Sequence, residues 1–582
     1  MPSQPSACPA NQNFRVAVYF CVTDIDKGRA DPAWLENSFH LLSRYLHIDK
    51  LYFETYRNGA WADKEAILFC KKFFESQGVK VSGGITYVES ESDFYHTCCY
   101  TRPEERQKVQ AAAEFAAGLF DEILLDDFFF TNCKCEACIV AKGERSWTEY
   151  RLELMRDAAQ NLLVGPAKKV NPGLKFSIKY PNWYDHFQYC GFDLEVEPNI
   201  FDGIYTGTET RDPVYTHQHL QRYESYAIFR YFENIAPGRN GGGWVDPFRR
   251  RTLDGYAEQL SLTLFAKAPE ITLFRYGDLF ETLHQSDGSV TYLSSFAPVA
   301  GYAFNRADAF LGALGLPVGL KAYKPFHSSG EDFLPNYLGM LGIPMDITPH
   351  FPAEAGICLL TEQARFDPDI VEKIKQQLVN GKRVVITSGL LRALQGKGIE
   401  EIVELDFTGK TALVRYFHDW QAVYPAEREL LIPQIRYPTN DAWELITALD
   451  SASGTGYPIL QRVDYAQGRL FVLTIPENVG DLYAYPQAVI TALKKIMLND
   501  FTVYVDSPSQ VSLFVYDNDT FIVASFQEYE LTVKLVVNPR FIKLVELPSG
   551  RIFTGHMEDG MRVFQAAIEP HQYLAFRAES GE

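Results

Sequence analysis

The sequence lacks the features of membrane proteins and of nucleic-acid-binding proteins. No apolar stretch reaches the roughly 18 residues that a membrane-spanning helix needs, and residues 1–14 show neither the basic start nor the apolar stretch of a secretory signal. Basic runs are confined to Arg249–Arg251, and the formal net charge is −19. Since nucleic acids and anionic membranes need basic patches, we expect neither as a partner, and we expect a cytoplasmic protein.

Disulfide bonds and nucleotide-binding signatures are also not expected. The chain has 10 cysteines, and several of them lie in apolar runs that are typical of reduced thiols in the cytoplasm, such as Cys21, Cys70 and Cys358. Residues 318–500 contain neither the G-x-G-x-x-G nor the G-x-x-x-x-G-K pattern, so this segment is not expected to bind nucleotides. An acidic chain with these absences is best suited to a neutral partner.

Up to about residue 317 the sequence alternates between strand-like runs and helical spacing. At 582 residues the chain is too long for one core and suggests about three domains. We predict eight strands, at 15–21, 50–54, 79–86, 122–126, 174–180, 201–206, 242–246 and 270–275. Eight strand-helix units favour an α/β fold, a (β/α)8 TIM barrel, whose active site belongs at the carboxyl ends of the strands.

Two further domains are expected after the barrel. Residues 334–387 give a helix, a strand, a second strand, an amphipathic helix and a third strand, an order typical of a doubly wound α/β sheet. Residues 501–582 alternate with period two between turns, which predicts an antiparallel β-sandwich. The predicted domains are therefore 1–317, 318–500 and 501–582.

The most informative stretch is DEILLDDFFFTNCKCEAC, residues 121–138. A short apolar strand ends in Asp126 and Asp127, where a strand of a parallel barrel opens into its site. Successive strand side chains point to opposite faces, so we expect only one of the two aspartates to point into the lumen. One is a candidate catalyst, and the other is its support.

Three clustered cysteines follow this acidic pair. Cys133, Cys135 and Cys138 have the spacing C-x-C-x2-C, which can bring three thiolates to a tetrahedral zinc ion, with Cys98 or Cys99 as the fourth ligand. Four thiolates would make a closed, structural zinc site, because a catalytic zinc keeps an open position. No catalytic cofactor is expected.

The strand, the acidic pair, the cysteines and a following helix with Trp147, Tyr150 and Leu154 resemble the fourth barrel strand of glycoside hydrolase family 42. In those β-galactosidases an Asn-Glu pair ends the strand, the Glu is the general acid/base, and four cysteines bind a structural zinc. The resemblance implies that Asp127 is the acid/base and that the nucleophile lies on the seventh strand, where Asp246 is the only carboxylate. Because aspartate is one methylene shorter than glutamate, substrate class and reaction geometry do not carry over.

The resemblance extends to domain order, and it implies an assembly. Family 42 enzymes have a barrel, a glutamine-amidotransferase-like (Rossmann-type) trimerisation domain and a terminal sandwich. By this resemblance we expect a homo-oligomer, with a trimer favoured.

The predicted strand ends carry acids, amides and aromatic side chains, as a sugar site requires. The candidate substrate-binding residues are Asp24, Glu54, Tyr56, Arg57, Lys179, Tyr180, Asn182, Trp183, Tyr205, Trp244, Arg275 and Tyr276. Arg57 and Arg275 are candidates to hold a catalytic carboxylate ionised or to bind an acidic sugar.

The second catalytic carboxylate stays open at this stage between Glu209, after strand six, and Asp246, after strand seven. We predict a glycoside hydrolase that cleaves a small oligosaccharide or glycoside with two carboxylates, with retention favoured by the resemblance. The alternatives are an α-glycosidase that uses Asp126 or Asp127 as nucleophile with Glu209, and a non-catalytic carbohydrate-binding protein.

Overall fold

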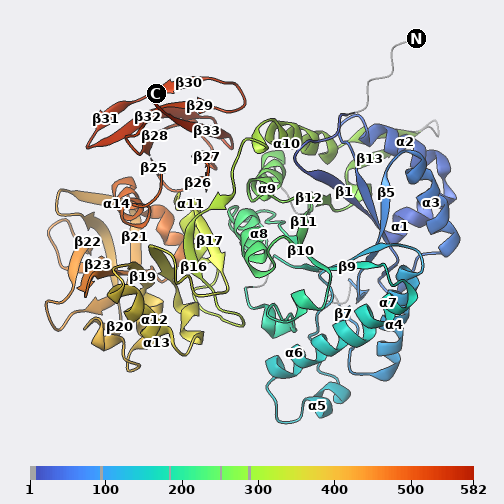
Figure 1. Cartoon of the computed structure of the whole chain (residues 1–582), viewed down its shortest axis with the longest axis horizontal. Coiled ribbons are helices and arrows are strands. Elements are labelled where there is room, and N and C mark those ends of the chain that lie inside the picture. The colour runs from blue at the N-terminus through green and yellow to red at the C-terminus, as the bar shows by residue number, and fades with distance from the viewer. Residues whose placement is uncertain (1–7, 92–95, 183–184, 249–251, 286–289, 582) are drawn as a thin grey trace. The chain divides into compact units, whose positions relative to one another are not determined.

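The computed structural model describes residues 8–91, 96–182, 185–248, 252–285 and 290–581 (Figure 1). The chain folds as two compact units, Met1–Gly312 and Ala313–Glu582. Among the described residues, no helix has both the length and the apolar character that crossing a membrane requires.

The first unit is a closed barrel of eight parallel strands, which confirms the predicted fold class. The strands follow one another around the barrel in chain order, and the last pairs with the first. They are β1 (Arg15–Phe20), β2 (Lys50–Glu54), β5 (Lys80–Ile85), β8 (Glu122–Leu125), β9 (Lys175–Tyr180), β10 (Gly203–Gly207), β11 (Asn240–Val245) and β12 (Glu270–Leu273). All eight predicted strands are present, with ends that shift by one or two residues.

Helices cover the outside of the barrel, because apolar residues at helical spacing give them a face that packs against the strands. The principal ones are α1 (Val22–Ala30), α2 (Pro32–Leu42), α3 (Lys64–Ser76), α4 (Pro103–Ala117), α6 (Trp147–Ala158), α8 (Glu224–Ile235), α9 (Leu253–Phe265) and α10 (Phe296–Leu311). The start of α3 shows the local cause: the Asp63 side chain accepts a hydrogen bond from Ala66 N at 2.8 Å and caps the first turn. Figure 1 shows these helices around the strands.

The barrel interior is filled by large aromatic side chains. Tyr19, Tyr52, Tyr205 and Trp244 belong to one buried cluster inside the strands. The glycine-rich β11 makes room for this packing, because a Cβ on Gly242 would lie 2.4 Å from the Tyr205 hydroxyl. The glycines of β11 make it hard to recognise as a strand in the sequence, but they allow it to pack against Tyr205.

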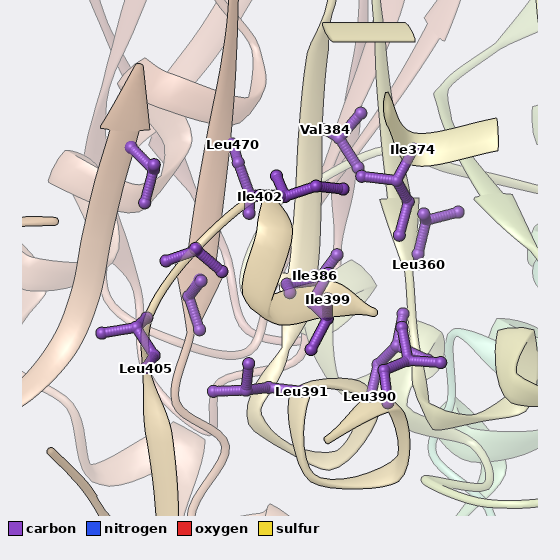
Figure 2. Packing of buried hydrophobic residues seen from close by; sticks show 14 of the residues in the cluster. Leu360, Ile374, Val384, Ile386, Leu390, Leu391, Ile399, Ile402, Leu405 and Leu470 are labelled. Atoms are coloured by element: carbon purple, nitrogen blue, oxygen red, sulfur yellow. The ribbon is translucent and has the colours of Figure 1, made fainter. Parts of the chain in front are cut away.

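The second unit contains a nine-stranded mixed sheet. Five strands are parallel: β16 (Leu320–Tyr323), β17 (Met345–Thr348), β18 (Ile357–Leu360), β19 (Arg383–Thr387) and β24 (Gly468–Leu473). With α12 (Ile370–Val379) and α13 (Ser388–Leu394) they enclose an aliphatic core that includes Leu360, Ile374, Val384, Ile386 and Leu390 (Figure 2).

The other four strands of this sheet are antiparallel and were not predicted. They are β20 (Asp406–His418), β21 (Val423–Arg436), β22 (Trp443–Leu449) and β23 (Gly456–Tyr465). Only part of each strand has one buried and one exposed face, and register shifts interrupt the pairing of β20 with β21. The period-two signal is therefore broken within the strands.

Two antiparallel sheets complete the unit. The predicted period-two runs form β26 (Val511–Tyr516), β27 (Thr520–Ser525), β28 (Leu531–Val537), β29 (Phe541–Glu546), β32 (Met561–Ile568) and β33 (Tyr573–Ser580). β15 (Pro317–Val318) pairs with β26, so the chain contributes to the terminal sheet before it enters the nine-stranded one. The three-domain boundaries stay a prediction.

Candidate active site

The candidate active site lies at the carboxyl ends of β8, β9 and β10. β8 ends at Leu125 and delivers Asp126 and Asp127, β9 carries Lys179 as its next-to-last residue, and Glu209 follows β10 by two residues. Because β8, β9 and β10 are adjacent parallel strands, their ends bring these side chains together. All four residues are at least 97% buried.

The Lys179 ammonium is the centre of this group. Its Nζ lies 2.7 Å from Asp127 Oδ2, 3.3 Å from Asp126 Oδ1 and 3.6 Å from Glu209 Oε1. The same nitrogen lies 4.3 Å from the ring centre of Trp244, over the indole face. Burial disfavours a charged lysine, but the nearby carboxylates outweigh it and raise the pKa of Lys179, so the ammonium stays charged.

Both aspartates reach Lys179, which corrects the expectation that only one would point inward. Strand alternation does not apply to them, because β8 ends at Leu125 and the backbone turns at the pair. The Asp127 N–H donates to Asp126 Oδ1 at 2.9 Å, and this bond fixes the turn.

Asp126 has donors on both of its oxygens. Its Oδ1 faces Lys179 and the Asp127 N–H, as described above. Arg57 Nη2 lies 3.2 Å from Asp126 Oδ2, and the Thr86 hydroxyl donates to the same oxygen at 3.2 Å. Burial raises the pKa of Asp126, but Lys179 and Arg57 outweigh it and bring the pKa below its ordinary value. Asp126 is therefore an ionised residue with little freedom to react.

Asp127 is less constrained than its neighbour. Its Oδ2 accepts from Lys179, and its Oδ1 has no hydrogen-bond partner among the described residues. Burial and the Asp126 charge raise the pKa of Asp127 to about 6, against the opposing effect of Lys179. This carboxyl has one oxygen available for a ligand.

Glu209 is the most perturbed acid of the group. Its Oε2 is buried and has no hydrogen-bond partner among the described residues. Burial raises the pKa of Glu209 to about 7, with Asp246 adding to the effect and Lys179 opposing it. A carboxyl group with a pKa near neutrality can donate and accept a proton at physiological pH.

Asn182 lies beside Glu209. Its side-chain nitrogen donates to the Glu209 carbonyl oxygen, and its Oδ1 is buried without a partner in the described part of the chain. A buried acceptor of this kind beside a buried acid is suited to the hydroxyl group of a ligand.

Asp246 belongs to a separate ion pair at the edge of the group. Arg211 Nη2 lies 2.9 Å from Asp246 Oδ2, and Arg211 Nε lies 3.3 Å from Asp246 Oδ1. The Phe248 N–H also donates to Oδ1 at 3.0 Å. Sequence reasoning missed Arg211, although an arginine two residues after Glu209 in the run E-T-R-D was a usable signal.

Arg57 is occupied by protein carboxylates. Its Nε lies 2.6 Å from Glu54 Oε1, its Nη1 contacts Glu91, and its Nη2 reaches Asp126. Arg57 therefore holds carboxylates of the protein in place, and its role toward a catalytic carboxylate or an acidic sugar stays a prediction.

Arg275 and Asp24 lie near the end of β1. Arg275 Nε is 3.4 Å from Asp278 Oδ1, and Asp24 accepts a hydrogen bond from Cys21 N at 3.1 Å. Burial raises the pKa of Asp24 to about 6. Neither residue contacts the group around Lys179.

Four predicted tyrosines do not join this group. Tyr180 follows Lys179 on β9 and therefore faces outward, where it stacks on Phe232 of α8 at 5.0 Å. Tyr276 packs outside the barrel, and its hydroxyl lies 2.9 Å from the Ser38 hydroxyl of α2.

The other two tyrosines are engaged elsewhere. Tyr205 lies deeper in the barrel and bonds to Thr272 at 2.7 Å, and Tyr56 donates to Glu89 at 2.5 Å. Trp183, also predicted at the site, lies outside the described residues.

The four predicted cysteines come together. The thiol sulfurs of Cys99, Cys133, Cys135 and Cys138 all lie within 4.8 Å of one another. Cys98, the other candidate for the fourth position, instead donates to Glu89 at 3.0 Å. These cysteines form a possible metal site, and Trp147, Tyr150 and Leu154 pack around it.

Three sequence families match the chain. Residues 4–308 match the family described as probable glycosyl hydrolase, catalytic domain. Residues 313–478 match the second domain of uncharacterized protein SSO3021, and residues 502–578 match a probable glycosyl hydrolase C-terminal domain. A relative from Saccharolobus solfataricus, also described as uncharacterized, is 24% identical and covers 90% of this chain and 91% of its own.

Solved structures resemble the whole chain in fold. Gan42B, a family 42 β-galactosidase from G. stearothermophilus, has a TM-score of 0.64 and 11% identity, with 99% of this chain and 100% of that chain covered. A β-galactosidase from Bacillus circulans has a TM-score of 0.62 and 10% identity, with coverage of 97% and 99%. An exo-β-1,4-mannosidase from an Opitutaceae bacterium has a TM-score of 0.54 and 11% identity, with coverage of 86% and 97%. The expected likeness to family 42 is confirmed.

Proposed function

The chain belongs to the probable glycosyl hydrolase family, and from that premise we propose that Asp127 and Glu209 are the catalytic carboxylates of a retaining glycosidase. The observation that carries this proposal is their shared contact with Lys179, at 2.7 Å and 3.6 Å. The two oxygens that contact Lys179 can be no farther apart than these distances added together. A short separation favours a retaining pair, whose carboxyl groups lie roughly 5–5.5 Å apart, over an inverting pair at roughly 6.5–9.5 Å.

The two acids differ in a way that assigns their roles. Glu209 has the higher pKa, about 7, and its proton is available for the departing glycosidic oxygen. Asp127 has the closer contact with the ammonium, which favours its ionised form and makes it the nucleophile.

The reaction then has two steps. In the first, an Asp127 oxygen bonds to the anomeric carbon while the bond to the aglycone breaks and Glu209 gives its proton to the leaving oxygen. In the second, Glu209 takes a proton from water, the water oxygen bonds to the anomeric carbon, and Asp127 leaves as a carboxylate. Asp126 and Arg57 position Asp127 and do not touch the reacting atoms.

A second assignment follows the family 42 resemblance and uses Asp127 as acid/base with Asp246 as nucleophile. It is favoured by the two contacts between Arg211 and Asp246, which hold that carboxylate in place. Against it, three donors already occupy both Asp246 oxygens, whereas Asp127 and Glu209 each have an oxygen without a hydrogen-bond partner in the described part of the chain.

The proposed substrate is a small oligosaccharide or glycoside. The similar structures are described as β-galactosidases and an exo-β-1,4-mannosidase, so β-galactosides and β-mannosides are the first candidates. α-Glycosides come next, because Asp127 as nucleophile with Glu209 is also the pair of the α-glycosidase alternative. Asn182 Oδ1 and Glu209 Oε2, which have no partner among the residues that the structure describes, would bind sugar hydroxyls.

The test is turnover of α- and β-linked aryl glycosides by wild type and by Asp127→Asn, Glu209→Gln and Asp246→Asn, with and without azide. We expect Asp127→Asn and Glu209→Gln to lose at least about 10³-fold in kcat, because each removes a group used in the transition state. Azide should restore product formation in both variants. The glycosyl azide should have inverted configuration with Asp127→Asn and retained configuration with Glu209→Gln. Inverted azide from Asp246→Asn would instead establish the second assignment.

For the four cysteines we propose a structural zinc. A tetrahedral site with Zn–S bonds of about 2.3 Å needs sulfurs roughly 3.8 Å apart. Cys99 lies 3.8 Å from Cys135 and 3.6 Å from Cys138, and Cys135 lies 3.6 Å from Cys138. The residues therefore fit the ion, whose role would be to stabilise the loop that follows Asp127.

Our proposals for the oligomeric state and the cellular compartment rest on the family 42 resemblance and on composition. We propose a cytoplasmic homo-oligomer, with a trimer favoured. Light scattering tests the assembly, since a single chain has a mass of 66.1 kDa.

A further inference from the structure

The antiparallel strands of the second unit form a cleft of about 740 Å³, a size suited to a small ligand. Its lining residues come from β20 to β23 and the segments next to them. They include three aromatic side chains and three acceptor-bearing ones, namely Phe407, Tyr437, Tyr457, Asp406, Gln434 and Glu444.

The cleft has two amide oxygens that are open to a ligand. Gln434 donates its amide nitrogen to the Thr411 carbonyl at 2.8 Å, and Gln395 donates its own to the Leu405 carbonyl at 3.1 Å. In this arrangement the side-chain oxygen of each amide has no partner among the described residues.

The charged side chains of the lining include both acceptors and donors. Arg436 donates to Asp406 Oδ2, and the Tyr437 and Thr447 hydroxyls donate to the two oxygens of Glu444. Lys410 adds an ammonium donor to the lining. Acceptors and donors together are complementary to sugar hydroxyl groups, each of which can both donate and accept.

Two tryptophans are linked to this cleft through Glu444. Trp420, in the turn between β20 and β21, and Trp443, at the start of β22, stack with ring centres 5.9 Å apart and an angle of 22° between planes. The indole N–H of Trp420 donates to the Glu444 carbonyl at 2.7 Å, so the residue that lines the cleft also holds the ring.

These tryptophans are exposed to an unusual degree. Trp420 is 61% and Trp443 is 65% exposed, whereas tryptophan is on average one of the more buried residue types. Nearly parallel exposed indoles present flat apolar surface, which suits the C–H face of a pyranose ring.

We propose that this cleft and the tryptophan pair form a second, non-catalytic carbohydrate-binding site for a neutral glycan. A second copy of this chain fits less well, because an apolar contact over the cleft would leave the amide oxygens of Gln395 and Gln434 buried without donors. A hydroxyl-rich glycan supplies donors to these two oxygens, and its ring faces cover the indoles. The site would bind a longer glycan whose small oligosaccharide fragments are the substrates of the barrel. That role, but not the binding itself, rests on the proposed function.

The test is native gel electrophoresis of the full chain in gels that contain β-1,4-galactan or β-1,4-mannan, with polygalacturonate as the charged comparison. We expect both neutral polymers, or one of them, to slow wild type and polygalacturonate to have no effect. Trp443→Ala and Tyr437→Ala should weaken the retardation about tenfold, which corresponds to the loss of one good stacking contact. Both residues are exposed, so truncation leaves no buried cavity.

Tyr302→Ala is the matched control, because Tyr302 is a 56% exposed aromatic residue on α10 of the barrel unit. It should migrate as wild type does. Turnover of an aryl glycoside should be unchanged in all three variants, since none of these residues is in the catalytic group.

Two results of the gel experiment would overturn the inference: no retardation by either neutral polymer, or equal retardation of wild type and Trp443→Ala. A change in the mass of Trp443→Ala by light scattering would also overturn it, because that result would identify an interface between copies of the chain. Trp443-dependent retardation without any glycoside turnover would leave this inference standing and remove the proposed function. Glycoside turnover without retardation would leave the proposed function standing and remove this inference.

Discussion

Lys179 Nζ lies 2.7 Å from Asp127 Oδ2, and both groups are almost fully buried. The same nitrogen reaches Glu209 at 3.6 Å, so one cation controls the protonation of both proposed catalytic acids. In water such a contact would contribute little, but burial strengthens it and makes it the main force opposing the rise of both carboxyl pKa values.

Replacing Lys179 by methionine should therefore change the pH dependence of catalysis. For wild type we expect kcat/KM to rise as Asp127 ionises near pH 6 and to fall as Glu209 loses its proton near pH 7. Without the ammonium both pKa values rise, so Lys179→Met should shift both limbs to higher pH and lower the maximum by about 10²-fold or more.

Lys175→Met is the control for this experiment. Lys175 begins the same strand and is exposed at the opposite end of the barrel. Its loss should leave the profile in place. A Lys179→Met enzyme with an unshifted profile would show that Lys179 does not set these protonation states.

Glu209 should make the protein less stable as pH rises. Its pKa is about 7 in the folded chain and about 4.5 when exposed, so between these pH values the folded state binds more protons than the unfolded state. The contribution of Glu209 to the free energy of unfolding must then fall from pH 4.5 to pH 7, by an amount on the order of 3 kcal/mol. Glu209→Gln removes this effect and should be more stable than wild type at pH 8 but not at pH 4.5.

Urea unfolding at both pH values measures the difference. Glu36→Gln, at an exposed position on α2, serves as control and should match wild type at each pH. If Glu209→Gln were no more stable at pH 8, a buried acid with a raised pKa at this position would be contradicted.

The barrel could be predicted from the sequence, but only part of its candidate site could. The eight strands were predictable because parallel barrel strands are short apolar runs at regular spacing, and Asp126 and Asp127 stood out at the end of one of them. The role of Lys179 was not predictable, because its contacts join three strands that lie far apart along the chain. Tyr180 and Tyr276 were misplaced because residue type and nearness to a strand end do not reveal which face a side chain occupies.

The cysteine cluster should contain about one zinc ion per chain. Cys138→Ser removes a buried ligand and should abolish stoichiometric zinc and lower the thermal midpoint, since a closed thiolate site contributes folding free energy. Cys98→Ser is the control, because Cys98 is also buried and adjacent to Cys99 but bonds to Glu89 instead. Elemental analysis of both variants makes the comparison. Zinc well below one per chain in wild type, or equal loss in both variants, would contradict the assignment.

The last prediction concerns the glycines of β11. A Cβ at Gly242 would lie 2.4 Å from the Tyr205 hydroxyl and 2.5 Å from the Glu270 carbonyl oxygen, whereas the nearest atoms to a Cβ at Gly241 are 3.4 Å away. Gly242→Ala should therefore destabilise the barrel by about 3 kcal/mol, and Gly241→Ala should cost much less. Because Trp244 follows Gly242 on this strand and lies against Lys179, a shift of β11 should also lower turnover. Urea unfolding and aryl glycoside assays of the two variants test both effects, and equal behaviour would show that Tyr205 yields to the added methyl group.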